Sequence, residues 1–478
     1  MPTIPKKAKS LSEMNSADIL NVTRSEIGGT YADQIPAVVK VGDTLPNGKI
    51  ATQADSIASL RGIGEIMMTY QPLQNAFLSA LVNRIGRIII TSRLYENPWA
   101  GFKKGLLEYG ETIEEIFVNL AKPYQYDPTV AESEVFKRRI PDVRASFHSM
   151  NYQKFYPTTV SNDQLRQAFL SWQGITDLIG KIIEQVYTGA NYDEFLVMKY
   201  MIAQVALKGE IYPVNVPAVT ADNARSVTTT MVSQARKLSY MSSQYNRAGV
   251  KTYTDPNFLY MILTTDIESI FDVEVLALSF NMNKAELIGR QIGVDGFGII
   301  DEERLAEIFA DDPYTSYVPF TKEQKTALSS IAGLMVDESW FMIFDNYYNM
   351  TEIYNPQGLY WNYFYHVWKT FSISPFSNAV LFTTETPAIN SITVSPAKVT
   401  VAKGATTQFS AVVVNTGFAP KDVIWSVTGT GDVISTIDVN GLLTVSGTET
   451  NTTLEVTATS AFDSSKKGTA TVTVTAQA

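Results

Sequence analysis

Two histidines, His148 and His366, are the first side chains to test for catalysis or metal binding in this chain. Histidine changes its charge near neutral pH and is the commonest metal ligand, so it suits either role. The two are far apart in sequence, and neither has a second histidine or a partner carboxylate at the short spacing of a zinc site. His366 lies within the aromatic run WNYFYHVW. We therefore interpret the histidines as packed side chains with satisfied hydrogen bonds.

Two glycine-containing motifs were compared with nucleotide-binding loops. GDTLPNGK (Gly42 to Lys49) has five residues between its glycines where a phosphate-binding loop needs four, and Ile50 replaces the Ser or Thr that binds magnesium. GVDGFG (Gly293 to Gly298) lacks the glycine spacing of a dinucleotide fingerprint. We predict a surface turn at Gly42 to Lys49 and no bound cofactor.

Two charged clusters complete the search for chemistry. Glu111, Glu114 and Glu115 could do acid–base work, but a charged face is the simpler interpretation. The basic run Lys137–Arg139 reads as a solvated face, with a donor of salt bridges between subunits as the alternative. The sequence contains neither GxSxG nor HExxH. Residue types and spacing therefore predict no enzyme and no metal site.

Composition limits the remaining possibilities. The 478 residues predict two to four folding units, and 45% hydrophobic residues allow a large core. Without cysteine the chain can form no disulfide or thiolate metal site. A net charge of −10 argues against gripping nucleic acid through its phosphates. The first twenty residues lack the apolar stretch of a signal peptide, and no apolar run approaches the roughly 18–20 residues of a membrane span. We expect a soluble, unexported protein.

The chain changes character near Thr383 to Asn390, and residues 386–478 read as a separate all-β domain. This part is rich in Thr, Val, Ser, Ala and Gly and alternates with the period of strands. Trp425 lies in the middle of a predicted strand, where β-sandwiches bury a tryptophan. Seven short strands predict a β-sandwich, and they are 391–395, 398–402, 408–414, 423–427, 441–446, 453–459 and 469–475.

The first 385 residues mix helix and strand, which makes the fold class α+β. Ser161 and Gln164 form a capping box, and an apolar stripe from Leu165 to Val186 predicts a long helix over 161–187 that stops at Gly189. A second helix is predicted from Asp193 to Lys208, ending at Gly209. Residues 97–127 are charged and weakly periodic, so we expect a long excursion that contributes little to the core.

Several segments resemble the major capsid proteins of the small phi-twenty-nine-type podoviruses in matching order. The resemblance runs from about residue 65 to the end, and residues 1–60 and the region near 311–330 depart from it. The segments are ALVNRIG (80–86), NPWAGFKKG (97–105), GETIEEI (110–116), VFKRRIPDVRASFH (135–148), SFNMN (279–283), DESWFMIFDN (337–346) and GLYWNYFYHVWKTFSISPFSNAVLF (358–382).

The resemblance implies a shell domain over 1–385 with the tailed-phage capsid fold of the Hong Kong ninety-seven type. Within it, 97–127 would be the extended loop, 161–187 the spine helix and about 210–340 the axial domain. Residues 386–478 would be a bacterial immunoglobulin-like group-two domain with Trp425 in its core. Candidate contacts between subunits are Lys103, Lys104, Glu111, Glu114, Lys137, Arg138 and Arg139.

The same resemblance implies the partners. The chain would assemble with itself into hexamers and pentamers, guided by a scaffolding protein and joined to a portal, with head fibres as a further candidate partner. It would be made in the host cytoplasm and enclose double-stranded DNA in the virion without reading its sequence. Two other readings stay open from the sequence, an adhesive or binding protein with an immunoglobulin-like module and an enzyme with an accessory β domain.

Overall fold

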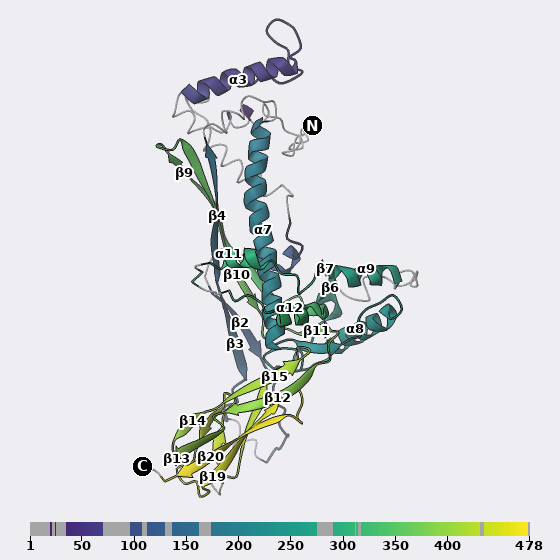
Figure 1. The fold of residues 1–478 in the computed structure, drawn as a ribbon, viewed down its shortest axis with the longest axis vertical. Coiled ribbons are helices and arrows are strands. Elements are labelled where there is room, and N and C mark those ends of the chain that lie inside the picture. Colours follow the sequence, from purple (N-terminus) through teal and green to yellow (C-terminus); the bar gives the residue numbers. More distant parts are fainter. Residues whose placement is uncertain are drawn as a thin grey trace. The chain divides into compact units, whose positions relative to one another are not determined.

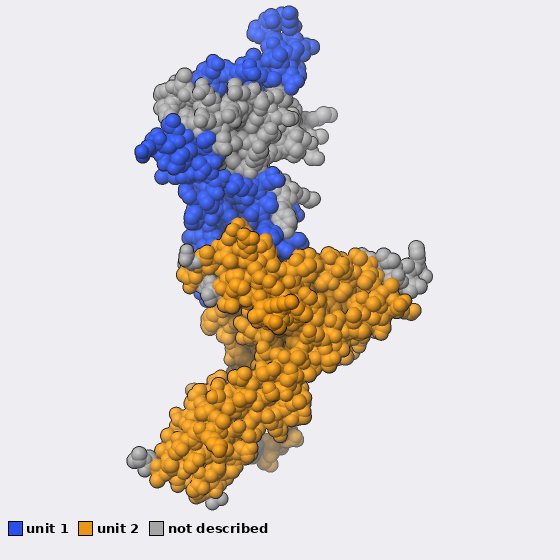
Figure 2. All heavy atoms as spheres, viewed as in Figure 1, with its two compact units in different colours: residues 1–112, 149–195, 343–371 blue, residues 113–148, 196–342, 372–478 orange. Residues whose placement is uncertain are grey.

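The computed structural model describes residues 20–21, 24, 35–69, 96–107, 112–129, 136–161, 174–274, 290–310, 312–313, 317–430 and 435–476. The chain divides into two compact units, shown in different colours in Figure 2. Unit 1 comprises Met1–Thr112, Ser149–Phe195 and Ile343–Phe371. Unit 2 comprises Ile113–His148, Leu196–Met342 and Ser372–Ala478. Within the described residues, no helix is both long and apolar enough to cross a membrane.

Unit 1 is built on a sheet with the strand order β1-β9-β10-β4, which lies along helix α7 (Figure 1). The strands are β1 (Lys103–Leu106), β4 (Tyr152–Ser161), β9 (Phe341–Asn355) and β10 (Tyr360–Ile373), and α7 is Gly174–Lys208. Side chains of β10 alternate between buried and half-buried, as expected when one face of a sheet is covered. Tyr365 on the buried face packs against Tyr187 of α7, with ring centroids 4.7 Å apart. Helix α3 (Gln53–Thr69) precedes these elements.

The long helix was predicted correctly in kind but not in extent. Gly189 does not end it, and α7 continues through the predicted second helix to Lys208. A glycine inside a helix costs only about 1 kcal/mol, and the buried side chains around it, such as Val186 and Leu196, supply more than that. The stop at Gly209 is confirmed, because this glycine has the left-handed φ of +75° that ends helices. Ser161 ends β4, and the rest of the predicted capping box lies outside the described residues.

The main sheet of unit 2 has the strand order β5-β11-β8-β6-β7. Its central strands are almost continuously apolar because both faces are buried. Helices α8 (Ala224–Leu238) and α9 (Thr265–Glu274) share a hydrophobic core with these strands. Two short helices follow, α11 (Glu302–Ile308) and α12 (Lys322–Ser329). The strands are β5 (Tyr212–Asn215), β6 (Leu259–Thr264), β7 (Arg290–Val294), β8 (Ile331–Asp337) and β11 (Ala379–Thr383).

Residues 97–127 do not form one excursion. The expectation of little core contribution is wrong for their first part, because Trp99 is 0% exposed and Phe102, at the end of the short 3-10 helix Ala100–Phe102, is 2% exposed. A tryptophan and a phenylalanine separated by small residues were enough to anchor a segment that lacks helical or strand periodicity. The excursion begins later, with a two-stranded ribbon of β2 (Thr112–Val118) and β3 (Val143–Ser149).

The seven predicted strands of the C-terminal part are all confirmed, each within a few residues. Trp425 is half-buried on β16 and packs against the hydrophobic core of this region. Two short strands, β14 and β17, were not predicted. The strands are β12 (Ala388–Ser395), β13 (Lys398–Ala402), β14 (Thr406–Gln408), β15 (Ser410–Thr416), β16 (Val423–Thr428), β17 (Thr436–Ile437), β18 (Leu442–Thr444), β19 (Thr453–Ser460) and β20 (Lys467–Thr475).

The surface turn predicted at Gly42 to Lys49 is also confirmed. Gly48 donates its backbone N–H to Leu45, and Thr44 and Ile50 form an isolated bridge across the turn. Almost the whole segment is exposed. The glycines thus serve backbone geometry, since Gly42 and Gly48 both have positive φ.

The close contact between Gly209, at the end of α7, and Ala419, among the C-terminal strands, can be tested by substitution. A Cβ at this position would lie 2.9 Å from the backbone oxygen of Ala419, whereas a Cβ at Gly249, which also has positive φ, would meet nothing within 4 Å. Both Gly209→Ala and Gly249→Ala suffer the left-handed backbone penalty of about 1–2 kcal/mol. We expect Gly209→Ala to lower the free energy of unfolding by about 1 kcal/mol more than Gly249→Ala. Urea unfolding of the two variants measures the difference, and equal losses would show that the Gly209–Ala419 contact contributes nothing.

Candidate functional site

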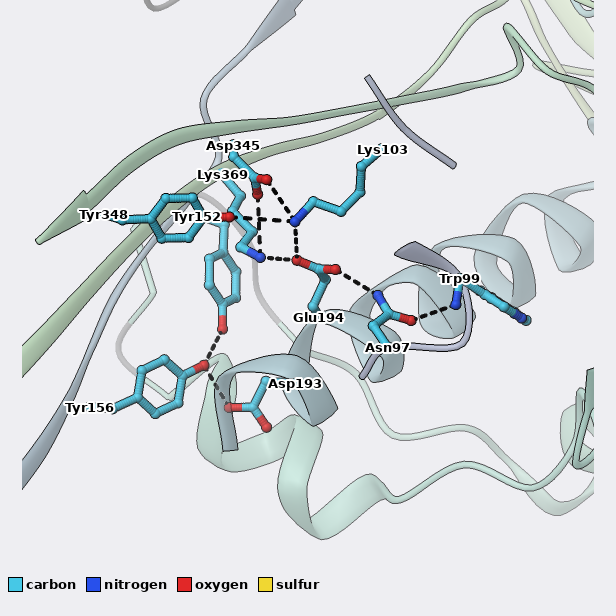
Figure 3. A network of polar contacts seen from close by, with 10 residues as sticks. All are labelled: Asn97, Trp99, Lys103, Tyr152, Tyr156, Asp193, Glu194, Asp345, Tyr348 and Lys369. Carbon is cyan, nitrogen blue, oxygen red and sulfur yellow. Dashed lines mark hydrogen bonds and ion pairs between the residues drawn. The ribbon is translucent and has the colours of Figure 1, made fainter. Parts of the chain in front are cut away.

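Four charged side chains meet in the interior of unit 1, and each comes from a different element (Figure 3). Lys103 belongs to β1, Glu194 to α7, Asp345 to β9 and Lys369 to β10. The side chains of Glu194 and Lys369 are 2% and 4% exposed, so both charges are removed from water. Buried charges persist only when they are paired and hydrogen-bonded, so Glu194 and Lys369 both need partners close by.

The contacts pair two amines with two carboxylates. Lys103 Nζ lies 3.2 Å from Glu194 Oε2 and 2.6 Å from Asp345 Oδ2. Lys369 Nζ contacts the same Glu194 oxygen and lies 3.4 Å from Asp345 Oδ1. Lys103 Nζ also donates to the hydroxyl of Tyr348 at 3.4 Å. The Glu194 carboxylate is therefore shared between two lysines.

The remaining oxygen of Glu194 is satisfied by the segment that carries Lys103. Asn97 Nδ2 donates to Glu194 Oε1 at 2.6 Å, and the backbone N–H of Trp99 donates to Asn97 Oδ1 at 2.8 Å. The ring of Trp99 packs edge-on against Phe195, with centroids 5.1 Å apart. A polar contact at Glu194 and an aromatic contact at the next residue thus anchor one short segment on α7.

A second polar chain begins one residue earlier on the helix. Tyr156 of β4 donates its hydroxyl to Asp193 Oδ2 at 2.8 Å, and the hydroxyls of Tyr152 and Tyr156 lie 2.8 Å apart. Burial, together with the neighbouring Tyr152 and Asp193, raises the pKa of Tyr156 well above its usual value. Tyr156 therefore stays protonated and acts as a permanent donor to Asp193.

The two lysines of the cluster affect each other electrostatically. Burial, and then the nearby Lys103, lower the pKa of Lys369 well below its usual value. The Glu194 carboxylate acts in the opposite direction, so the lowering reflects the loss of water and the second amine. The cluster joins one side chain from each of four elements, β1, α7, β9 and β10. Its geometry fits a structural fastening of helix to sheet.

His148 lies in a separate cluster within unit 2 and is buried. Its Nδ1 is 2.7 Å from the hydroxyl of Ser372, and its Nε2 is 3.2 Å from Glu115 Oε2. Ser374 donates to the other oxygen of Glu115 at 2.7 Å. The interpretation of His148 as a packed, hydrogen-bonded side chain is confirmed, although its carboxylate partner 33 residues away was not foreseen.

His366 lies in unit 1 and is only half-buried. Its Nε2 is 3.3 Å from the hydroxyl of Thr351, and its ring packs near Phe155 with centroids 5.8 Å apart. This also matches the predicted packed histidine. Among the described residues, no group of three or more His, Asp or Glu side chains is placed to hold a metal ion.

The other residues singled out from the sequence do not gather at the charged cluster. Lys104, Glu114 and Lys137 to Arg139 are exposed, and the guanidinium of Arg139 lies 4.0 Å from the centre of the Tyr124 ring. Glu111 lies outside the described residues. Lys103 is half-buried and held within its own chain, so its environment differs from that of the lysine beside it.

Three members of the cluster, Glu194, Asp345 and Lys369, were not singled out from the sequence. The sequence did hint at Lys369. Apolar and polar residues alternate along β10, and Lys369 stands at a buried position, where a charge needs a partner. A second signal was position, since Lys103, Asp345 and Lys369 lie in three different segments that carry the family resemblance. Nothing in the sequence paired them with Glu194, because Asn97 and Lys369, two of its partners, lie 97 and 175 residues away from it.

Removing the shared carboxylate tests the fastening. In Glu194→Gln the side chain keeps its size, but Lys103 and Lys369 lose the carboxylate that they share in a buried site. We expect a loss of about 3 kcal/mol in the free energy of unfolding. Glu184→Gln, on the exposed side of the same helix, should change it by less than about 0.5 kcal/mol. Chemical denaturation of both variants decides, and similar small changes in both would contradict a structural role for Glu194.

Comparison with known proteins finds a matching family model and several similar proteins. The family model described as the Phi29-like phage major capsid protein matches residues 22–383. The major capsid protein of Bacillus phage PZA is 34% identical over 447 residues, covering 92% of this chain and 89% of its own. That of Bacillus phage B103 is 35% identical over 451 residues, with the same coverage. A chain in the capsid structure of Staphylococcus phage Andhra has a TM-score of 0.46 at 15% identity, covering 62% of this chain and 86% of its own. The extent of the family and sequence matches shows that the chain belongs to the Phi29-like phage major capsid protein family.

Proposed function

We propose that this major capsid protein assembles with itself, guided by a scaffolding protein and joined to a portal, into the icosahedral or prolate head that encloses the DNA genome. The observation that carries the proposal is the family match over residues 22–383. Assembly takes place in the host cytoplasm, head fibres are a further candidate partner, and the DNA is held without sequence recognition. The net charge of −10 suits a wall that must not bind its contents tightly.

The shell part, residues 1–385, has the Hong Kong ninety-seven type of capsid fold in this proposal. Helix α7 (Gly174–Lys208) is the spine helix in this proposal. It includes 174–187 of the predicted range 161–187 and continues beyond it, and residues 162–173 lie outside the described residues. The sheet containing β5 to β8 and β11, with α8 and α9, is the axial domain near 210–340. The extended loop is the β2–β3 ribbon, because the first residues of the range 97–127 belong to the core.

Residues 386–478 form an immunoglobulin-like sandwich of the bacterial group-two kind in this proposal. Strand β11 ends at Thr383 in the main sheet, and β12 begins at Ala388. The core to which Trp425 contributes draws its residues from Ile389 onward. Residues on both sides of this boundary belong to compact unit 2, where Lys421 donates to the backbone oxygen of Leu207 at 3.1 Å. We propose that the sandwich is a domain with its own core, which contacts the end of α7 through Lys421.

The ribbon supplies a contact to a neighbouring copy. Its outward side chains and its connecting segment expose large apolar groups, including Tyr126 at 84% and Phe136 at 90%. We take these exposed groups as part of the surface that meets the next copy. A ribbon that binds a different surface of the next copy makes a head-to-tail contact, and such contacts close into rings of five or six. The basic residues Lys137 to Arg139 lie beside Phe136 and add charge to the contact.

Charge reversal on the ribbon tests this contact. Lys137→Glu combined with Arg138→Glu should reduce assembly in the presence of scaffold while leaving the monomer folded. Each exposed pair is worth only about 0–1 kcal/mol, but the loss recurs at every copy in the shell. The control is Lys398→Glu with Lys467→Glu, two exposed positions in the C-terminal strands. Electron microscopy and sedimentation measure the yield of shells, and unimpaired assembly of the ribbon variant would remove this contact from the proposal.

Truncation tests the role of the sandwich. A chain ending at Thr384 keeps β11 and the whole main sheet, so we expect it to fold and to form shells with scaffold. It loses the Lys421–Leu207 contact, so the shells should dissociate at a lower denaturant concentration than those of the full chain. Circular dichroism of the monomer and microscopy of the shells are the measurements. Failure of the shortened chain to fold would mean that the sandwich belongs to the main core.

A further inference from the structure

The segment that carries Lys103 forms the edge of the unit 1 sheet. We call residues 97–106 the clip. Its strand β1 is the edge strand and runs parallel to β9, with a register shift between its pairs Lys103↔Ile343 and Leu106↔Asp345. Leu106, at the end of β1, is more than half exposed. The inner end is held by Trp99 and by the contact of Asn97 with Glu194.

Lys103 and Lys369 compete for one oxygen atom, Oε2 of Glu194. The two competitors are not equally free to leave. Lys369 lies on β10, which is paired on both sides in the sheet order β1-β9-β10-β4, and stands opposite Tyr152 of β4. Lys103 lies on the short edge strand and is 20% exposed. If the two amines repel each other, the clip is therefore the part that moves.

Groups from all the packed elements face the Lys369 amine. Lys103 of β1 brings a positive charge, while Glu194 of α7 and Asp345 of β9 bring negative charges. The ring of Tyr348, also on β9, has its centroid 5.7 Å from Nζ. When Lys369 is uncharged, docked Lys103 still provides a positive charge for both carboxylates of the cluster, because it contacts Glu194 and Asp345.

We propose that the clip is a proton-linked latch, which docks through Lys103 when Lys369 is uncharged and loosens when Lys369 takes up a proton. This goes beyond the proposed role in the shell and does not depend on it. Loosening would uncover the edge of β9, and an uncovered strand edge can pair with another chain.

The sign of the pH dependence follows from the cluster. Burial and then docked Lys103 hold the pKa of Lys369 below its usual value. When the clip leaves, the contribution of Lys103 is lost and the pKa of Lys369 rises, so undocking takes up a proton. Lower pH therefore favours the loosened clip. Docking should depend on pH between the lowered pKa of Lys369 and the ordinary lysine value of about 10.4. Because one proton is taken up, the docking equilibrium can change by at most about tenfold per pH unit.

Hydrogen exchange of the full-length chain measures the latch directly. Mass spectrometry should follow the peptide that contains residues 97–106 at a series of pH values from about 6 to 10.5, which includes the upper end of the expected window, after correction for the intrinsic exchange rate. We expect the corrected opening equilibrium to increase as pH falls, by up to about tenfold per unit. Peptides from β10 and α7 serve as internal references and should show no such slope. A clip whose corrected exchange does not change with pH would overturn the proposal.

Two variants separate the latch from general loosening. Lys369→Met removes the competing amine and should abolish the pH slope while the clip stays docked through Lys103. Lys103→Met should raise the exchange of residues 103–106 at every pH and also abolish the slope, while Trp99 and Asn97 still hold the inner end of the clip. Lys104→Met changes the adjacent exposed lysine and should keep the wild-type slope. If Lys369→Met does not fold, Lys369→Gln provides the same comparison, and the Lys103→Met result decides independently. A slope that persists in Lys103→Met would contradict the proposal.

Discussion

The carboxylate of Glu194 is the point on which the arrangement of unit 1 depends. It is almost fully buried, and a buried anion is tolerated only if its partners are in place. Those partners come from β10 and from the clip, so a shift of either element would leave a charge unpaired in the interior. Asp193, the preceding residue, applies the same constraint to β4 through Tyr156. Adjacent helical residues point about 100° apart, which explains how two neighbouring carboxylates reach different parts of one sheet.

A buried charge cluster is a weak source of stability, because desolvation offsets most of its attraction. Its contribution is that it excludes other positions of the helix on the sheet. Apolar contacts such as Tyr187 on Tyr365 allow a helix to slide on a sheet at modest cost, whereas a shift at Glu194 or Lys369 costs several kcal/mol. A structural virion protein is repeated many times in one shell, and it is a building block, not an enzyme. For such a chain, a single defined position of the helix on the sheet is worth more than extra stability.

The parts of the fold that were predictable are those set by local pattern. The C-terminal strands follow period-two alternation, and Gly209 ends a helix through its backbone conformation. The errors have a common cause, which is that tertiary packing overrode a local signal. Gly189 failed to stop α7 because its neighbours are buried, and the clip entered the core through Trp99 without any periodicity. The charged cluster and the Glu115–His148 pair could not be derived, because each joins residues that only the folded chain brings together.

The same reasoning explains why Lys103 and Lys104, adjacent and identical in type, have different roles. Strand geometry turns successive side chains to opposite sides, so one lysine faces the interior carboxylates and the other faces solvent. A charge in a low-dielectric site acts strongly on its neighbours, whereas an exposed charge is screened within about 8–10 Å at physiological salt. Lys103 can therefore influence the protonation of Lys369 inside the subunit, and Lys104 is suited to weak contacts with its surroundings. A subunit that keeps its strong electrostatic interactions inside and its weak ones outside can fold firmly as a monomer and still assemble reversibly, which lets misplaced copies dissociate before a closed shell forms.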